Sequence, residues 1–202
     1  MSENLIKLIS EEKIFPIIRC KDPVKTVEIA KALHDGGIKI VEINAENPSI
    51  YSAISEISSF MNVCAGGIIT SLQADTAVRS GANLISSPIF SMNLVKLSKD
   101  INVPYIAGTS TANEAYSAWK ARVPLIKIYP ITALGGAMYL EDLLRPMPFL
   151  NILPLGNVKL DEVKSYINAG AKAVGVGRDF YDGLSLCDIT ERAKKVLADL
   201  RN

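Results

Sequence analysis

The chain alternates between short apolar runs and amphipathic segments from one end to the other. Each run is rich in β-branched residues and ends near Gly, Pro or Asn, as buried strands do. The runs occupy residues 13–20, 38–44, 62–67, 83–88, 103–108, 124–130, 150–156 and 172–177. Several of the segments between them begin at Asp, Ser or Thr and stop at Gly, as helix caps require. This alternation predicts eight parallel βα units.

Eight regular units favour a closed (β/α)8 TIM barrel over an open doubly wound sheet. No GxGxxG motif follows the first run, which argues against a dinucleotide-binding fold. The 202 residues suit the short end of the barrel range and contain no linker or low-complexity tract. We therefore expect one α/β barrel domain over residues 1–202. The first dozen residues are amphipathic, and we expect them to form an N-terminal extra helix that covers the bottom of the barrel.

The composition is that of an ordinary globular protein, with 49% hydrophobic residues, 21% charged residues and a net charge of +1. No strong positive field exists to attract nucleic acid or an anionic membrane. The amino terminus lacks the apolar core of a signal peptide, and no apolar stretch is long enough to span a bilayer. These features predict a cytoplasmic protein with no nucleic acid or membrane partner.

Cysteine and histidine usage argues against a metal centre. Cys20, Cys64 and Cys187 are widely spaced and odd in number, so neither a disulfide framework nor a zinc site is indicated. We interpret all three as small buried residues in a reducing compartment. The only histidine, His34, lies inside a helical pattern. We therefore expect no metal and no cofactor.

Three charged residues interrupt the predicted strands. Lys127, Glu42 and Arg19 each stand on one face of a run whose opposite face is apolar. Side chains alternate across a strand, so the apolar face should pack on the helices and the charged face should point into the barrel. Barrel enzymes place their sites at the carboxyl ends of the strands. We therefore expect the three charges to converge there.

A buried lysine beside a buried glutamate has a specific chemical use. Burial disfavours a charged side chain, which makes the neutral, nucleophilic amine of a lysine more available. A nearby carboxylate can move protons. Lys127 and Glu42 therefore supply the two groups, an amine and a base, that Schiff-base catalysis on a carbonyl compound requires at least. Spacing alone supports equally a structural salt bridge that fills the barrel.

The loops after the last two runs have the composition of an anion site. Phosphate-binding barrels use these loops, which here span residues 154–157 and 175–183. Glycines let backbone N–H groups approach an anion, and a short helix beginning near Asp179 would add its dipole. The guanidinium of Arg178 could donate two parallel hydrogen bonds to such an anion. Glycine after a strand is also common in simple turns.

At these residues the sequence resembles the 2-keto-3-deoxy-6-phosphogluconate / 4-hydroxy-2-oxoglutarate aldolase family and its sister, the 2-keto-3-deoxy-6-phosphogalactonate aldolases. The matching pieces cover nearly the whole chain: AKALHDGGIKIVEI around Glu42, SSP ending in Pro88, VPYIAGTST at 103–111, and IKIYP with ALGG around Lys127. The resemblance implies a (β/α)8 homotrimer that acts on a small-molecule keto acid. It implies reversible cleavage of a 2-keto-4-hydroxy acid to pyruvate and an aldehyde.

The resemblance also assigns roles to individual residues. Lys127 would form the Schiff base with the 2-keto group, and the protonated imine would accept electrons when the C3–C4 bond breaks. Glu42 would remove the proton of the C4 hydroxyl. Tyr129 stands where the family has an aromatic side chain against the substrate, and Pro88 shapes the pocket wall.

The substrate-binding positions depart from the gluconate-type pattern. The arginine four residues after the catalytic glutamate is Glu46 here, and the threonine of the GAGT motif is replaced by Gly67. The phosphate-binding motifs after the last two strands read Leu155, Gly156, Asn157 and Gly177, Arg178.

Two arginines offer compensation for these departures. Arg19 matches an arginine at the end of the first strand in galactonate-type enzymes, where it can serve the substrate carboxylate. Arg178 replaces a serine as an anion ligand. A carboxylate at Glu46 would repel an acidic substrate unless Arg19 or Arg178 pairs with it.

Two other functions compete with a class I aldolase. The substituted Gly67, Leu155 and Glu46 are compatible with an inactive keto-acid-binding or phosphate-binding barrel that has lost turnover. A phosphate-binding barrel isomerase would use Glu42 as its base and Lys127 as an electrostatic partner.

Overall fold

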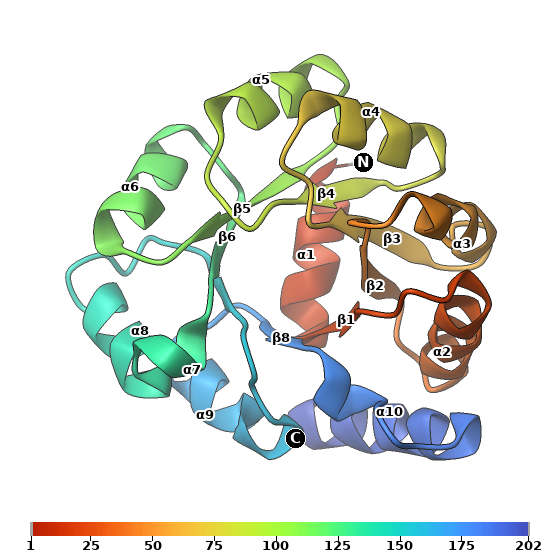
Figure 1. Cartoon of the computed structure of the whole chain (residues 1–202). Coiled ribbons are helices and arrows are strands. Elements are labelled where there is room, and N and C mark those ends of the chain that lie inside the picture. The colour runs from red at the N-terminus through yellow and green to blue at the C-terminus, as the bar shows by residue number, and fades with distance from the viewer. Residues whose placement is uncertain (1, 202) are drawn as a thin grey trace.

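Eight parallel strands curve into a nearly closed barrel in the computed structural model, which describes residues 2–201 (Figure 1). The strands are β1 (Ile14–Ile18), β2 (Ile40–Asn44), β3 (Asn62–Gly66), β4 (Leu84–Ser86), β5 (Tyr105–Thr109), β6 (Leu125–Ile128), β7 (Ile152–Pro154) and β8 (Val174–Val176). Seven of the predicted runs contain one of these strands, and the run at 103–108 covers all of β5 except Thr109. The strand order is β7-β6-β5-β4-β3-β2-β1-β8, and a parallel bridge between Leu155 and Gly175 joins the two ends. The predicted (β/α)8 barrel is confirmed.

Helices surround the barrel and follow each strand (Figure 1). They are α1 (Ser2–Glu12), α2 (Pro23–Asp35), α3 (Tyr51–Ile57), α4 (Ser71–Arg79), α5 (Met92–Asp100), α6 (Ala112–Lys120), α7 (Ile131–Leu134), α8 (Gly136–Leu144), α9 (Val163–Asn168) and α10 (Leu186–Arg201). Short 3₁₀ turns occupy Pro48–Ile50, Leu160–Glu162 and Arg178–Phe180. Thr70 and Thr111 start α4 and α6 with full capping boxes, which satisfy backbone N–H groups that the helix leaves without a partner.

Side chains alternate between two apolar layers along each strand. On β2, Ile40 faces the barrel interior, whereas Val41 and Ile43 pack against the helices. On β6, Leu125 faces inward and Ile126 faces the helices. The interior cluster also includes Phe15, Ile17, Cys64, Leu84, Ile106, Leu153, Leu155 and Ala173. The predicted orientation of the strands is confirmed, so polar residues in register with this cluster point into the barrel.

The amino-terminal helix closes the bottom of the barrel. In Figure 1, α1 crosses behind the strands. Its Ile9 is fully buried in the interior cluster, and Leu5, Ile6 and Leu8 pack against the same cluster. The predicted extra helix is confirmed. The prediction of one domain over residues 1–202 includes Met1 and Asn202, which lie outside the described residues, and it stays a prediction.

The cysteines differ from one another in exposure. Cys64 is buried as expected, but Cys20 is half-buried and Cys187 is exposed near the start of α10, so the expectation of three buried thiols is wrong. His34 is exposed on α2 and meets the ring of Phe60 edge-on at 5.5 Å. Across residues 2–201, no group of three His, Cys, Asp or Glu side chains is placed to hold a metal ion, and no helix could cross a membrane.

One carboxylate under the barrel makes stability depend on pH. Glu12, at the end of α1, accepts the backbone N–H of Lys39 at 3.1 Å through Oε1, and its buried Oε2 has no partner among the described residues. Burial raises the pKa of Glu12 to about 7, against the lowering effect of the Lys39 N–H and of the Lys39 and Arg201 charges. The folded state therefore binds a proton that the unfolded state releases, and this contribution to stability is present below about pH 4.5 and lost as the pH rises through 7.

Glu12→Gln should therefore stabilise the protein only at higher pH. We expect its free energy of unfolding to rise by about 1–2 kcal/mol at pH 8 and to change little at pH 4.5, after a discount for the partial exposure of the group. Urea unfolding at both pH values measures the difference. Glu11→Gln, which neutralises an exposed neighbour on the same helix, is the matched control. An equal effect of both variants would contradict the raised pKa of Glu12.

Candidate active site

Strands β2 and β6 bring Glu42 and Lys127 together inside the barrel. The Nζ atom of Lys127 donates a hydrogen bond to Oε2 of Glu42. Lys127 is only 4% exposed and Glu42 only 3%. A lone charge at this depth would be strongly unfavourable, and the opposite charge offsets much of its desolvation. The predicted convergence of these two residues is confirmed.

Ser86 is a third member of this cluster. It lies at the end of β4, is fully buried, and its Oγ accepts a second hydrogen bond from Nζ of Lys127. The SSP motif predicts a role for Pro88, and Ser86 of the same motif was not predicted. The available signal was strand alternation, because Ser86 stands two residues after the inward-facing Leu84.

Two residues on β3 shape the surroundings of Glu42. Cys64 lies 3.8 Å from Oε2 of Glu42 and acts as a weak S–H donor to it. Burial, followed by the neighbouring carboxylate, raises the pKa of the Cys64 thiol, so the thiol stays protonated. Gly66 leaves space for the glutamate, since a Cβ atom there would lie 2.8 Å from Cγ of Glu42. The carboxylate is therefore held in one orientation toward Lys127.

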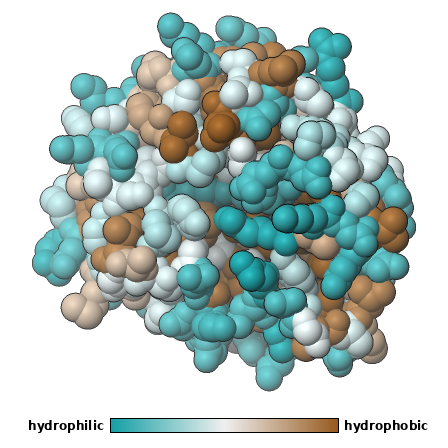
Figure 2. All heavy atoms as spheres, viewed as in Figure 1, coloured by the Kyte–Doolittle hydropathy of each residue, from teal (hydrophilic) through white to brown (hydrophobic). Residues whose placement is uncertain are grey.

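Two adjoining cavities open at the carboxyl ends of the strands. The inner one, of about 40 Å³, is lined by the predicted residues Glu42, Gly67, Pro88 and Lys127. The outer one, of about 420 Å³, is lined by Gly156, Asn157, Gly177 and Arg178. Both are lined by Arg19, Tyr129 and Leu155. Figure 2, viewed from the same side as Figure 1, shows mostly hydrophilic side chains around a hollow near the middle of this face.

Arg19 is placed differently from the prediction. We expected it to converge with the other two charges inside the barrel, but β1 ends at Ile18 and Arg19 is exposed at the mouth. Its guanidinium lies 5.9 Å from the centre of the Tyr129 ring. Among residues 2–201 its side chain forms no ion pair within 4.0 Å. An exposed arginine avoids desolvation, and it remains available to an anion that enters either cavity.

Glu46 also stays without a cationic partner in the described chain, since neither Arg19 nor Arg178 pairs with it. Its carboxylate accepts the side-chain amide of Asn44 at 3.1 Å, and its backbone N–H donates to Oδ1 of Asn44 at 3.1 Å. Gly67 has a φ of 76°, and a Cβ atom there would lie 3.1 Å from Oδ1 of Asn44. A Cβ atom at Gly67 would also lie 3.2 Å from Cγ of Glu46, so the two departures from the family pattern are neighbours in space.

The outer cavity has a different anion-binding chemistry from the one expected. The predicted helix near Asp179 is a three-residue 3₁₀ turn, too short to supply a helix dipole. Asp179 pairs with Lys159 at 3.1 Å and accepts the N–H of Leu160 at 2.9 Å. Although burial opposes the shift, these bonds lower the pKa of Asp179. Exposed Arg178 and Arg19, together with the backbone of the glycine loops, can still donate hydrogen bonds to an anion in this cavity.

A parallel barrel with a buried lysine and glutamate at the carboxyl ends of its strands defines the class as a lysine-dependent barrel enzyme. Comparison with known proteins narrows the class. Residues 5–192 match the family model described as KDPG and KHG aldolase, and the chain belongs to that family.

Individual relatives agree with this placement. The chain is 26% identical over 170 residues to a 2-dehydro-3-deoxy-phosphogluconate aldolase of Haemophilus influenzae, covering 82% of this chain and 80% of the relative. It is 26% identical over 173 residues to the 2-dehydro-3-deoxy-6-phosphogalactonate aldolase of Escherichia coli, covering 83% and 84%. The crystal structure of a Legionella pneumophila KDPG aldolase, with pyruvate captured as a covalent carbinolamine intermediate, shares the fold with a TM-score of 0.86. The two chains are 23% identical, and the match covers 95% of this chain and 97% of that one.

Removal of the Ser86 hydroxyl should slow any reaction that passes through Lys127. Ser86→Ala deletes one of the two hydrogen bonds that hold the amine, and a bond to a charged group contributes about 1.5–3 kcal/mol. We expect kcat to fall by about 10–100-fold with the fold retained. Steady-state kinetics and circular dichroism measure both properties.

Ser87→Ala is the matched control for this variant. Ser87 is also buried and lines the same cavity, but its hydroxyl accepts the N–H of Ile89 at 3.2 Å. Similar losses of kcat in the two variants would rule out a specific role for Ser86.

Proposed function

We propose that the protein is a class I, Schiff-base aldolase that cleaves a 2-keto-4-hydroxy acid to pyruvate and an aldehyde. The substrate would be a 2-keto-3-deoxy-6-phospho sugar acid or 4-hydroxy-2-oxoglutarate. The observation that carries this proposal is the buried amine of Lys127, hydrogen-bonded to Glu42 and Ser86 where barrel enzymes place their sites. Membership of the KDPG and KHG aldolase family supports it.

The geometry suits formation of an imine. The amine of Lys127 attacks the C2 carbonyl of the substrate and forms a carbinolamine, which loses water to give a protonated imine. The hydrogen bond between Glu42 and Lys127 gives the lysine proton a direct path to a carboxylate before the attack. Ser86 holds the amine on its other side, which restricts the direction from which the carbonyl can be approached.

Cleavage then requires a proton acceptor near C4. A base removes the proton of the C4 hydroxyl, the C3–C4 bond breaks, and its electron pair flows into the imine to leave an enamine. Glu42 is the described carboxylate in contact with Lys127, and we assign this role to it. Protonation of the enamine at C3 and hydrolysis of the imine release pyruvate and restore Lys127.

Charge at the mouth supports an acidic substrate. Arg19 lines both cavities, so it can meet the carboxylate of a keto acid whose C2 is bonded to Lys127. Arg178, Gly156, Asn157 and Gly177 line the outer cavity, whose volume of about 420 Å³ lies within the range of metabolite sites. We assign the distal phosphate or carboxylate of the substrate to this outer cavity, and the ring of Tyr129 to the wall between the two ends.

We further infer that the protein acts in the cytoplasm as a homotrimer, as the family resemblance implies. Exposed apolar side chains at the starts of the neighbouring helices α4 and α5 support burial against another copy. They are Ile69, Leu72, Ile89 and Met92.

Trapping with borohydride tests the proposed covalent step. Incubation with pyruvate and sodium borohydride should leave a reduced pyruvyl group on Lys127, located by peptide mass spectrometry. Lys127→Arg should form no adduct and release no pyruvate from the candidate substrates, because arginine keeps the charge but cannot form the imine. Glu42→Gln should lower kcat by about 10²–10⁴-fold.

Lys96→Arg, which alters an exposed lysine on α5, is the control for these variants. Full activity in Lys127→Arg would instead favour an isomerase in which the lysine acts only through its charge. Pyruvate binding without cleavage of any candidate substrate would favour a barrel that binds keto acids without turnover.

Removal of the two charges at the mouth, Arg19 and Glu46, should change KM in opposite directions. Arg19→Ala removes the proposed ligand of the substrate carboxylate and should raise KM by about tenfold or more. Glu46→Gln removes a repulsive charge and should lower KM by up to about fivefold, with a smaller effect in high salt. Substrate titrations at low and high ionic strength measure both. Unchanged KM in both variants would place the carboxylate elsewhere.

A further inference from the structure

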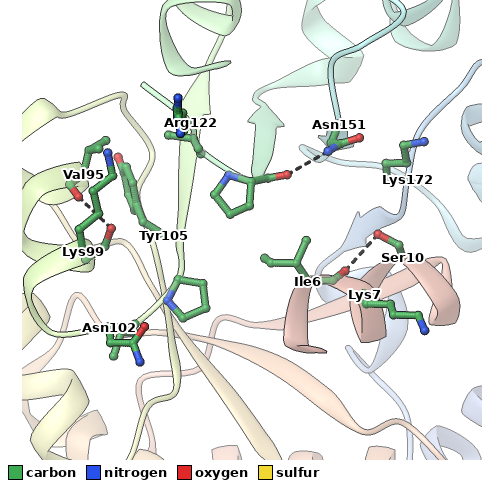
Figure 3. Close-up of a pocket in the computed structure, with 15 residues that line it drawn as sticks. Ile6, Lys7, Ser10, Val95, Lys99, Asn102, Tyr105, Arg122, Asn151 and Lys172 are labelled. Carbon is green, nitrogen blue, oxygen red and sulfur yellow. Dashed lines mark hydrogen bonds between the residues drawn. The ribbon is translucent and has the colours of Figure 1, made fainter. Parts of the chain in front are cut away.

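A second cavity lies at the opposite end of the barrel from Glu42 and Lys127 (Figure 3). It has a volume of about 590 Å³, within the range of sites that hold small metabolites. Ile6 of α1 forms one wall, and Tyr105 and Pro124 lie where β5 and β6 begin. The proposed aldol reaction has no use for this cavity.

The charged residues that line this cavity are all positive. Four of its lining residues are the cations Lys7, Lys99, Arg122 and Lys172, and none of the lining residues found within residues 2–201 is acidic. The whole chain carries a net charge of only +1, so these cations are a local concentration. Figure 3 shows Lys99 and Arg122 on one side of the cavity and Lys7 and Lys172 on the other.

Ordinary structural roles account for two of the four cations. Lys7 pairs with Glu11 at 3.5 Å on the surface of α1. Lys99 reaches the carbonyl of Ala121 at 3.5 Å, where a cation also complements the negative end of α6. The side chains of Arg122 and Lys172 make no hydrogen bond and no ion pair with any other part of the described chain.

The backbone at the cavity rim provides an independent observation. Three helices end with glycine as the second residue past the helix, in a left-handed conformation: Gly37 after α2, Gly81 after α4 and Gly170 after α9, with φ of 96°, 102° and 104°. The same position after α5 and α6 is Asn102 and Arg122, with φ of 53° and 63°.

These two exceptions both line the cavity. A left-handed conformation is unfavourable for any residue with a Cβ atom, and least so for Asn. Strain of this kind is retained where the side chain is used. At both helix ends that border the cavity, a side chain able to donate hydrogen bonds therefore stands where α2, α4 and α9 use glycine.

We propose that this cavity binds a small organic polyanion, a phosphate ester or a polycarboxylate, with Arg122 and Lys172 as its principal charged ligands. Because the two cations stand on opposite sides, they suit a ligand with negative groups at both ends. Asn102 and Asn151 supply neutral donors, and the apolar side chains of Ile6 and Val95 contact its carbon skeleton. The site is independent of the aldolase assignment.

Titration calorimetry on the full chain tests the site. The probes are citrate, phenyl phosphate and inorganic phosphate at fixed ionic strength. We expect at least one of the two organic anions to bind more tightly than inorganic phosphate. Arg122→Gly and Lys172→Ala should each raise its Kd by about tenfold or more. Arg122→Gly also relieves the left-handed strain, so its melting temperature without ligand should not fall, which separates lost binding from lost folding.

Two control variants make the test specific. Arg79→Ala removes an exposed arginine that pairs with Asp75 at 2.8 Å on α4, and it should leave Kd unchanged. Arg178→Ala alters the barrel mouth and should also leave Kd unchanged. The proposal is overturned by absence of binding for both organic probes, by an equal loss in Arg79→Ala, or by a loss in Arg178→Ala with binding retained in Arg122→Gly. A lower melting temperature of Arg122→Gly would overturn the strain argument.

Discussion

The ammonium group of Lys127 and the carboxylate of Glu42 hold each other inside a barrel that is otherwise filled with aliphatic side chains. Neither charge could remain at this depth alone, because desolvation would exceed any gain from packing. Together they require neighbours that fit their shape: Ser86 beside the amine and Gly66 beneath the carboxylate. The hydroxyl of Thr109 also donates to the backbone carbonyl of Lys127 at 2.9 Å and anchors β6. Residues of four other strands, β2 to β5, therefore position Lys127 of β6.

The charged residues at the mouth of the barrel differ from those in its interior, because they are exposed to solvent. Inside, the buried amine of Lys127 is hydrogen-bonded to both Glu42 and Ser86. Outside, the carboxylate of Glu46 accepts a hydrogen bond from Asn44, and Gly67 gives the room that this pair requires. Arg19 and Arg178 are exposed, follow the neighbouring strands β1 and β8, and line the same outer cavity. In the proposed aldolase these solvent-exposed charges would set the choice of substrate, and they can change without disturbing the buried pair.

The two ends of the barrel are separated by its apolar interior. Helix α1 closes the lower end through Ile9, so a ligand in the lower cavity has no open path to Lys127. The lower cavity is lined by cations and by two strained helix ends, Asn102 and Arg122, whereas the two upper cavities are lined by both cations and carboxylates. A barrel offers both surfaces because loops at each end are free of the packing constraints that govern the strands.

The sequence by itself determined the barrel, its extra helix and the inward orientation of Lys127 and Glu42, because strand alternation and helix caps depend on local neighbours. Strand alternation turns Ser86 inward, but only closure of the barrel decides which inward-facing side chains meet the amine of Lys127. The sequence also could not foresee the exposure of Arg19, since a difference of one residue at the end of β1 decides whether the side chain is buried or reaches solvent. The cationic cavity beneath the barrel likewise arises only when α1 and the ends of α5 and α6 meet. Patterns along the chain report local preference, whereas burial and charge pairing depend on which distant segments the fold brings together.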